Sequence, residues 1–491
     1  MDKQRYLEEI DDVIQRGPFE ADWSSLFQYK LADWYQKAKF GIFIHWGVYS
    51  VPAYGNEWYS RNMYIQGSKE YEHHLQTYGP HKKFGYKDFI PMFQAEHFRP
   101  GEWAELFDKA GARYVMPVAE HHDGFQMYNS DISSFNAYEM GPKRDVLKEL
   151  GDSLEKRGIP LCASSHRIEH WFFMGHGRQF ESDIHEPLEE EDFYWAAMPE
   201  PENHHDLFST PAPSSEFLVD WFLRSCEIVD RYRPKVFYFD WWVQHEAVKP
   251  YLKKFAAYYY NRADQWGEEV AINYKHDAFM FGSAVVDIER GQFAEQKPYF
   301  WQTCNSVARN SWCYTENNQY KSSNELICDL VDIVSKNGAL LLNIGPKADG
   351  TIPDDDKQIL LDIGEWLQIN GEAIYESKVW RKSGEGPTEI QEGQFTDATA
   401  KSFTAEDIRF TVNGSHLYAI VLQWPEDGIV HIKSLAEKDA SKLPHFHGII
   451  KDIQILGFEN KPTWVRSEES LEISASGVRS KNPVVCKISL D

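Results

Sequence analysis

Positive charge is scarce in this chain of 491 residues. Lys and Arg number 51 against 76 Asp and Glu, which gives a formal net charge of −25 at pH 7. A strongly acidic protein repels the phosphates of nucleic acids and the surface of anionic membranes. We therefore expect no nucleic acid and no membrane as partner, and a neutral substrate fits the charge better.

Cysteine is rare too, and long apolar runs are missing. The six cysteines form no C-x-x-C pair, and Cys162, Cys226 and Cys328 lie in apolar stretches, so we expect reduced, buried thiols. No run of about 18 apolar residues occurs, and the charged N-terminus MDKQRYLEEIDD lacks the apolar region of a signal peptide. The sequence indicates a soluble, cytoplasmic protein, or a secreted or periplasmic one if a leader has been removed.

Three common catalytic motifs are also absent. The chain has no G-x-G-x-x-G, no P-loop and no G-x-S-x-G. The sequence therefore offers no motif for dinucleotide binding, phosphoryl transfer or serine hydrolysis. Aromatic residues, in contrast, make up 15% of the chain and include 17 Trp, a surplus that is typical of a cleft or an interface.

Apolar stretches that resemble buried strands recur through most of the chain. They lie at 40–47, 112–119, 159–165, 236–240, 269–275, 283–291, 299–304 and 339–346. Most are separated by helical patterns, at about 100–110, 143–157, 215–231, 248–265, 323–336 and 354–369. Polar residues follow nearly every strand, as at the active face of a parallel barrel. The pattern predicts a TIM-like (β/α)8 barrel, with two short helices before it and a long loop, 175–212, over the site.

The character of the sequence changes after the last of these helices. A polar, glycine-containing linker, GEGPTEIQEGQFTD, precedes alternating runs that are joined at Asn413-Gly414, a strong hairpin signal. We expect a catalytic barrel domain at 1–379 and a C-terminal β-sandwich domain at 380–491. No candidate catalytic carboxylate lies in the second domain, so it is expected to support the barrel.

A carboxylate and two tryptophans follow the fourth predicted strand. Asp240 ends the apolar run VFYF, where parallel strands collect ligand-binding groups. A bland interpretation is that Asp240 only caps the next segment. Trp241 and Trp242, as exposed aromatics beside a carboxylate, favour a ligand with apolar C–H faces, such as a sugar ring.

A second carboxylate, Glu289, follows the sixth predicted strand. Cleavage of a glycosidic bond needs two carboxyl groups, one ionised as nucleophile and one with a raised pKa that protonates the leaving oxygen. Asp240 and Glu289 can face one gap across a barrel mouth. Glu295 is the rival acid, and pairing of Glu289 with Arg290 or Lys275 is the structural alternative.

Adjacent histidines follow the second predicted strand. Neighbouring residues on a strand point in opposite directions, so one metal ion could hardly use both His121 and His122. We expect no metal and no cofactor, because neutral imidazoles donate to and accept from sugar hydroxyls. Glu57 beside Trp58 suits the same ligand, with a surface salt bridge as the alternative. His166, Glu169 and His170 follow the third strand, and for the last two a solvated loop face is favoured.

Seven ordered blocks in residues 30–380 carry a family resemblance. FGIFIHWG, NEWYS, RYVMPVAEHHDGF, GPKRDVLKEL, PKVFYFD, NSWCY and VSKNGALLLNIGPKADGTIPDDD resemble the α-L-fucosidases of glycoside hydrolase family 29. The resemblance implies a retaining exo-glycosidase that works without metal, with a C-terminal β-sandwich.

The resemblance also implies residue roles. Asp240 matches the nucleophile, and Glu289 is the expected acid/base from its strand position. The other expected binding residues are His45, Trp46, Glu57, Trp58, His121, His122, Tyr238, Lys275 and Trp312. Lys275 stands where the family often has Arg, and the third-strand segment ASSHRIEHW departs from the usual Tyr-containing pattern.

The sequence thus predicts an α-L-fucosidase that acts on fucosylated oligosaccharides. Two alternatives stay open: a catalytically silent sugar-binding protein and a metal-dependent hydrolase on a barrel fold. The sequence does not decide the linkage preference or the leaving group. It also leaves the oligomeric state open, with a homo-oligomer as one option.

Overall fold

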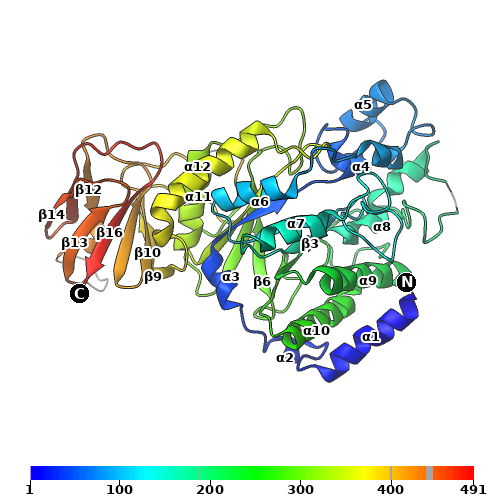
Figure 1. Cartoon of the computed structure of the whole chain (residues 1–491), viewed down its shortest axis with the longest axis horizontal. Helices are drawn as coiled ribbons and strands as arrows, with labels where there is room; N and C mark the ends of the chain where they lie inside the picture. Colours follow the sequence, from blue (N-terminus) through cyan, green and yellow to red (C-terminus); the bar gives the residue numbers. More distant parts are fainter. Residues whose placement is uncertain (1, 186, 399–400, 438–445) are drawn as a thin grey trace.

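The structure is a computed structural model that describes residues 2–185, 187–398, 401–437 and 446–491 (Figure 1). Eight parallel strands close into a barrel in the order of the sequence. They are β1 Phe40–Ile44, β2 Val115–Glu120, β3 Ala163–Ser165, β4 Val236–Phe239, β5 Ala271–Tyr274, β6 Val285–Glu289, β7 Trp301–Ser306 and β8 Gly338–Ile344. Ile42 of β1 lies opposite Val115 of β2 on one side and Leu342 of β8 on the other, which closes the barrel. The predicted (β/α)8 class is confirmed.

Helices surround the barrel and precede it (Figure 1). They are α1 Lys3–Arg16, α2 Trp23–Leu26, α3 Asp33–Ala38, α4 Tyr59–Asn62, α5 Lys69–Thr77, α6 Pro100–Lys109, α7 Val146–Glu155, α8 His170–Phe173, α9 Ser215–Tyr232, α10 Lys249–Trp266, α11 Ser323–Ser335 and α12 Asp354–Asn370. Their ends follow from local chemistry: the Ser214 hydroxyl caps α9 by accepting from the Phe217 N–H, and Gly267 ends α10 in the left-handed region. Residues 275–284 and 290–300, all described, contain no helix, so β5, β6 and β7 follow one another through loops alone.

The N-terminal lead-in differs from the prediction of two helices. The break at Gly17 and Pro18 is present, but Asp22 then caps the short α2 by accepting from the N–H groups of Ser24 and Ser25. Three helices therefore precede β1. Among the described residues, no helix is long and apolar enough to cross a membrane. All six cysteines are buried and unpaired, as expected.

Two antiparallel sheets follow the barrel. Their strands are β9 Lys378–Glu385, β10 Ile408–Asn413, β11 His416–Val421, β12 Ile429–Ile432, β13 Ile450–Ile455, β14 Thr463–Arg466, β15 Leu471–Ser474 and β16 Val484–Leu490. The larger sheet has the order β13-β16-β11-β10-β9, and the smaller has the order β12-β15-β14. Asn413 pairs with His416 across a two-residue turn, which confirms the predicted hairpin.

The larger sheet is covered on both faces. Along β11, Leu417, Ala419 and Val421 belong to the core between the two sheets, whereas Tyr418 and Ile420 belong to the core of the barrel domain. Because successive strand residues point to opposite faces, this alternation places the sheet between the smaller sheet and the barrel helices. Figure 1 shows it beside α11 and α12. The C-terminal region is therefore packed firmly on the barrel.

Candidate active site

A cavity of about 590 Å³ opens at the carboxyl-terminal ends of the barrel strands. It is lined by Phe43, His45, Asn56, Glu57, Trp58, His121, His122, His166, His205, Tyr238, Asp240, Trp241, Lys275, His276, Glu289, Cys304, Trp312, Gln394 and Phe395. Every residue that the sequence assigns to the site, except Trp46, is among them. A larger hollow, about 990 Å³ between α6 and α12, is lined by none of these residues.

Asp240 directly follows β4 and is only 7% exposed. Its Oδ1 accepts a hydrogen bond from Lys275 Nζ at 2.8 Å, and its Oδ2 accepts one from the Nδ1–H of His166 at 2.9 Å. Burial alone would raise the pKa of Asp240, but the Lys275 ammonium and His166 outweigh burial and hold the pKa well below its ordinary value. Asp240 is therefore an ionised carboxylate, the state that a nucleophile requires.

Glu289, the last residue of β6, shares Lys275 with Asp240. Lys275 Nζ lies 2.6 Å from Glu289 Oε2 and 2.8 Å from Asp240 Oδ1. The two carboxylate oxygens are therefore no farther apart than the sum of these distances. This limit, which holds for one oxygen of each carboxylate, agrees with the separation of about 5 to 5.5 Å between the carboxyl groups of retaining glycosidases.

The rival acid lies elsewhere. Glu295 is exposed and lines a separate hollow together with Lys297 and Lys336. Of the two residues, only Glu289 lines the cavity. Arg290, one of the two alternative partners of Glu289, is instead paired with Asp397.

Lys275 is almost fully buried, and both of its ion-pair partners are carboxylates of the site. Burial lowers the pKa of Lys275, but Asp240 and Glu289 outweigh burial and raise it well above its ordinary value. The side chain is therefore a permanent cation between the two carboxylates. Its ammonium also lies over the ring of Tyr238, 5.4 Å from the centroid, while the Tyr238 hydroxyl donates to Asp287.

Three buried histidines form one wall of the cavity. The Nδ1–H of His45 donates to Asn343 Oδ1 at 2.7 Å, and the Nδ1–H of His122 donates to the carbonyl of His166 at 2.8 Å. Burial lowers the pKa of His45 and of His121 well below the ordinary value and lowers that of His122 to about 3. The three imidazoles are neutral at pH 7, so each can donate to or accept from a ligand hydroxyl.

Glu57 and the tryptophans form another part of the wall. Glu57 Oε2 accepts from the backbone N–H of Trp312 at 3.0 Å, and Glu57 is 7% exposed, so the alternative of a surface salt bridge is wrong. Burial raises the pKa of Glu57 although the Trp312 N–H opposes the rise. Half-buried Trp58 stacks on Trp241, with ring centroids 6.2 Å apart. These rings offer apolar faces to a ligand.

Four expectations need correction. Trp46 packs with Phe93, Phe98 and Trp103 and donates to the Lys347 carbonyl, because it follows His45 on the strand path and points the opposite way. Trp242 is buried rather than exposed, for the same reason relative to Trp241. Glu169 and His170 are fully buried, not on a solvated face: the chain turns inward after β3, and the Nδ1–H of His170 donates to the His122 carbonyl.

Three residues of the cavity in particular were not assigned to the site from the sequence, although His166 was noted after the third strand. His166 directly follows β3, the same position that drew attention to Asp240 after β4, so its place was open to prediction. Gln394 and Phe395 come from the linker before β10, in the region expected only to support the barrel. No local pattern in the sequence connects that linker to the barrel mouth.

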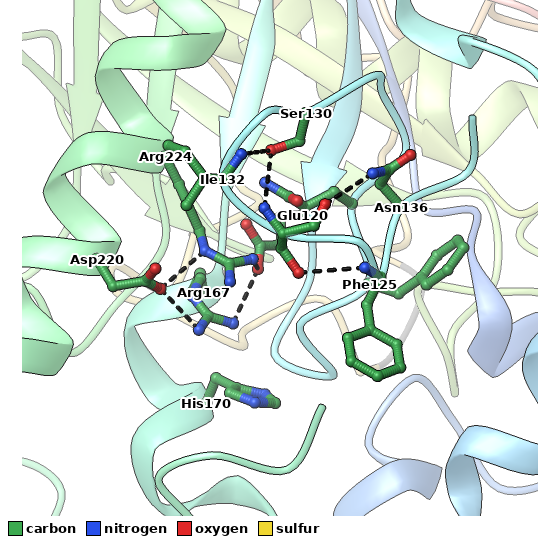
Figure 2. Close-up of polar contacts among 12 residues, drawn as sticks. Glu120, Phe125, Ser130, Ile132, Asn136, Arg167, His170, Asp220 and Arg224 are labelled. Atoms are coloured by element: carbon green, nitrogen blue, oxygen red, sulfur yellow. Dashed lines mark hydrogen bonds and ion pairs between the residues drawn. The ribbon is translucent and has the colours of Figure 1, made fainter. Parts of the chain in front are cut away.

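Figure 2 shows a buried ion-pair network of Glu120, Arg167, Asp220 and Arg224. Glu120 Oε1 accepts from Arg167 at 3.0 Å and from Arg224 at 3.1 Å, and Asp220 Oδ2 accepts from the same two guanidinium groups at 2.9 and 2.8 Å. Burial would raise the pKa of Asp220, but the two arginines lower it to about 2. Glu120 precedes His121, and Arg167 follows His166. The network therefore ties the ends of β2 and β3 to α9 and positions the cavity histidines.

Two sets of side chains within the described residues could hold a metal ion. They are His45, His121 and His166, and His122, His166 and Asp240, with potential ligand atoms within 4.8 Å of one another in each set. No set includes both His121 and His122. The expected opposite directions of these two side chains are wrong, however: β2 ends at Glu120, both imidazoles line the cavity, and their ring centroids are 4.3 Å apart. One ring nitrogen of two of these histidines already bonds to a protein group: His45 Nδ1 to Asn343 and His166 Nδ1 to Asp240.

The fold and the site are those of a glycoside hydrolase. The barrel is closed and parallel, two carboxylates share one cation, and neutral imidazoles and tryptophans form the wall of the cavity. Comparisons with known proteins narrow this class. A family model described as α-L-fucosidase matches residues 7–372, and one described as the α-L-fucosidase C-terminal domain matches residues 401–486. The chain belongs to the α-L-fucosidase family, as its sequence blocks suggest.

Individual relatives agree with this assignment. Tissue α-L-fucosidase of Rattus norvegicus is 33% identical over 455 residues, which cover 91% of this chain and 86% of the relative. Plasma α-L-fucosidase of Homo sapiens is 30% identical over 469 residues, covering 92% and 87%. The crystal structure of Thermotoga maritima α-fucosidase with a mechanism-based inhibitor is 30% identical, with a TM-score of 0.74, and covers 96% of this chain and 100% of that one. The same T. maritima enzyme has also been solved with fucose, at a TM-score of 0.73.

Proposed function

We propose that this chain is a retaining, exo-acting α-L-fucosidase that releases terminal α-L-fucosyl residues from oligosaccharides or glycoconjugates by double displacement. The observation that carries the proposal is the pair Asp240 and Glu289 held on one Lys275 ammonium, at a separation suited to retention. The fucose complex of the T. maritima relative supports fucose as the sugar that enters the cavity.

In the first step Asp240 attacks the anomeric carbon of the fucosyl residue. The bond from that carbon to the glycosidic oxygen breaks, and Glu289 protonates the departing oxygen. Glu289 is a carboxylate paired with Lys275 in the unliganded site, so it takes up a proton from solvent before this step. A covalent fucosyl ester on Asp240 results. The Lys275 and His166 contacts keep Asp240 ionised until the attack, so the nucleophile needs no separate base.

In the second step water replaces the leaving group. Glu289, now a carboxylate, takes a proton from the water as its oxygen attacks the anomeric carbon, and Asp240 leaves. Two inversions restore the original configuration. We assign the neutral imidazoles of His45, His121 and His122 to the fucose hydroxyls, with Trp58 against an apolar face of the ring.

The stereochemistry of the first product tests the proposal. Wild-type protein with an aryl α-L-fucoside should release α-L-fucose first, and proton NMR distinguishes it from the β-anomer before mutarotation mixes them. A β-anomer as first product would contradict the double displacement. Absence of any turnover would instead favour the sugar-binding alternative.

The two histidine sets keep the metal-dependent hydrolase as a second candidate. Metal analysis of the purified protein, together with activity before and after dialysis against EDTA, separates the candidates. Double displacement by Asp240 and Glu289 needs no metal, so activity should persist after EDTA. Loss of activity that zinc restores would favour the second candidate.

A further inference from the structure

The linker between β9 and β10 returns from the C-terminal sheets to the mouth of the barrel. The backbone N–H of Phe395 donates to the carbonyl of Glu289 at 2.9 Å, and that of Thr396 donates to the carbonyl of Arg290 at 2.8 Å. Gly393 N–H donates to the Gln292 carbonyl at 3.1 Å. Residues 393–396 therefore lie along the chain that leaves β6, beside the proposed proton donor.

Ion pairs fix this linker in place. The Asp397 carboxylate accepts from Arg290 Nε at 3.1 Å and also contacts Lys321 Nζ. The Lys321 side chain is fully buried, so this anchor is shielded from water and from salt. Gly291 allows the close approach, because a Cβ at this position would lie 1.9 Å from the Gly393 carbonyl oxygen. Residues 393–397 are thus held against the barrel at the edge of the site.

Two side chains of the linker, Gln394 and Phe395, line the cavity. Phe395 is 60% exposed, although burial of an aromatic ring is favourable, and its backbone is held in the left-handed region with φ of 53°. The Gln394 Oε1 atom is buried and accepts no hydrogen bond within the described residues. The Phe395 ring therefore gains free energy when a bound molecule covers it, whereas Gln394 Oε1 is already covered by protein atoms.

We propose that Gln394 and Phe395 form the subsite for the leaving group, and that its ligand is the pyranose ring linked to the fucosyl residue. The inference rests on the proposed function, in which Glu289 protonates the glycosidic oxygen. The leaving group must then lie on the Glu289 side of the cavity, where the Phe395 backbone is bonded to Glu289. A C–H face of the pyranose packs on the exposed Phe395 ring, and Gln394 lines the cavity wall beside it.

The test compares two substrates that differ only in the leaving group. One is a disaccharide of α-L-fucose and a hexopyranose, and the other is α-L-fucosyl fluoride, whose fluoride leaves the subsite empty. In Phe395→Ala, the ratio of kcat/KM for the disaccharide to that for the fluoride should fall about tenfold, because the ring contact is lost. Phe395→Tyr keeps the ring and should keep the ratio. An unchanged ratio in Phe395→Ala would overturn the subsite.

A variant that moves the linker without altering its side chains gives a second measurement. Gly291→Ala forces the Gly393 carbonyl away and should lower the same ratio with Phe395 and Gln394 intact. Phe27→Ala is the matched control, since Phe27 is 62% exposed but lies off the cavity, and it should leave the ratio unchanged. Wild-type protein that hydrolyses neither substrate refutes the proposed function as well, whereas hydrolysis of both with unchanged ratios in the Phe395 and Gly291 variants refutes the subsite alone.

Discussion

Replacement of Lys275 by Met removes the cation that the two carboxylates of the site share. At the 2.8 Å of the contact with Asp240, Coulomb's law with an effective dielectric constant of about 20 gives a gross attraction of roughly 6 kcal/mol. The net cost is smaller, because Lys275 no longer has to be buried. Loss of one partner from a buried ion pair typically costs about 3 to 5 kcal/mol, and we expect that loss of stability near pH 7.

The pH dependence of this loss has a definite sign. The pKa of Asp240 is depressed in the folded wild type, so its contribution to stability is present at neutral pH and is lost as the pH falls through that low pKa. Without Lys275, Asp240 gains a proton at higher pH in the folded protein, which relieves the repulsion between the carboxylates. The stability difference between wild type and Lys275→Met, measured by urea unfolding, should therefore shrink as the pH is lowered.

Activity gives an independent measurement of the same effect. Because the nucleophile must be ionised, the acid limb of the pH profile of kcat/KM should move to higher pH in Lys275→Met. Lys275→Arg keeps the positive charge and is the matched control, whose acid limb should stay closer to that of wild type. An unchanged acid limb in Lys275→Met, or an equal displacement in both variants, would refute the reasoning that this charge keeps Asp240 ionised.

Four further predictions follow from the same geometry. Asp240→Gly should lower kcat by several orders of magnitude, and azide should restore part of the rate by forming the β-fucosyl azide; normal turnover without azide would contradict the nucleophile. Glu289→Gln should slow disaccharides far more than activated aryl fucosides, because only a poor leaving group needs the proton, while Glu295→Gln should show no such dependence; the opposite outcome would exchange the two assignments. Glu120→Gln removes one of the two buried negative charges that pair with Arg167 and Arg224, so it should lower the free energy of unfolding by up to about 3 to 5 kcal/mol. An unchanged urea midpoint would show that the network does not stabilise the protein. A fragment that ends near residue 380 should be less soluble and less active, since it exposes the barrel face under the larger sheet and lacks Phe395; a stable fragment with full disaccharide activity would contradict this.

The sequence alone predicted the barrel and the position of one catalytic candidate, Asp240. A strand buried on both faces is apolar throughout, so eight such runs between helical patterns could be recognised locally, and each run was found as a strand. The position of Asp240 after β4 followed from the same pattern, because the carboxyl ends of parallel strands meet at one face of a barrel. The hairpin at Asn413 needed only its turn residues.

Side-chain direction at the strand ends was decided by tertiary structure. His45 faces the cavity and Trp46 the core, although both follow the same strand and both suit a sugar site. A shift of one residue exchanges the two faces of a strand, and composition alone does not set that register at a strand end. The same limit applies to Trp241 and Trp242.

Contacts between distant segments were beyond the sequence for a different reason. Glu289 and Glu295 have the same chemistry, and only the fold places Glu289 beside Lys275 and Glu295 at an exposed position. Phe395 reaches the cavity because the larger sheet packs on the barrel and Asp397 pairs with Arg290. Local periodicity records which face of an element is buried, but not which distant element covers it, so this part of the site is defined by the folded chain alone.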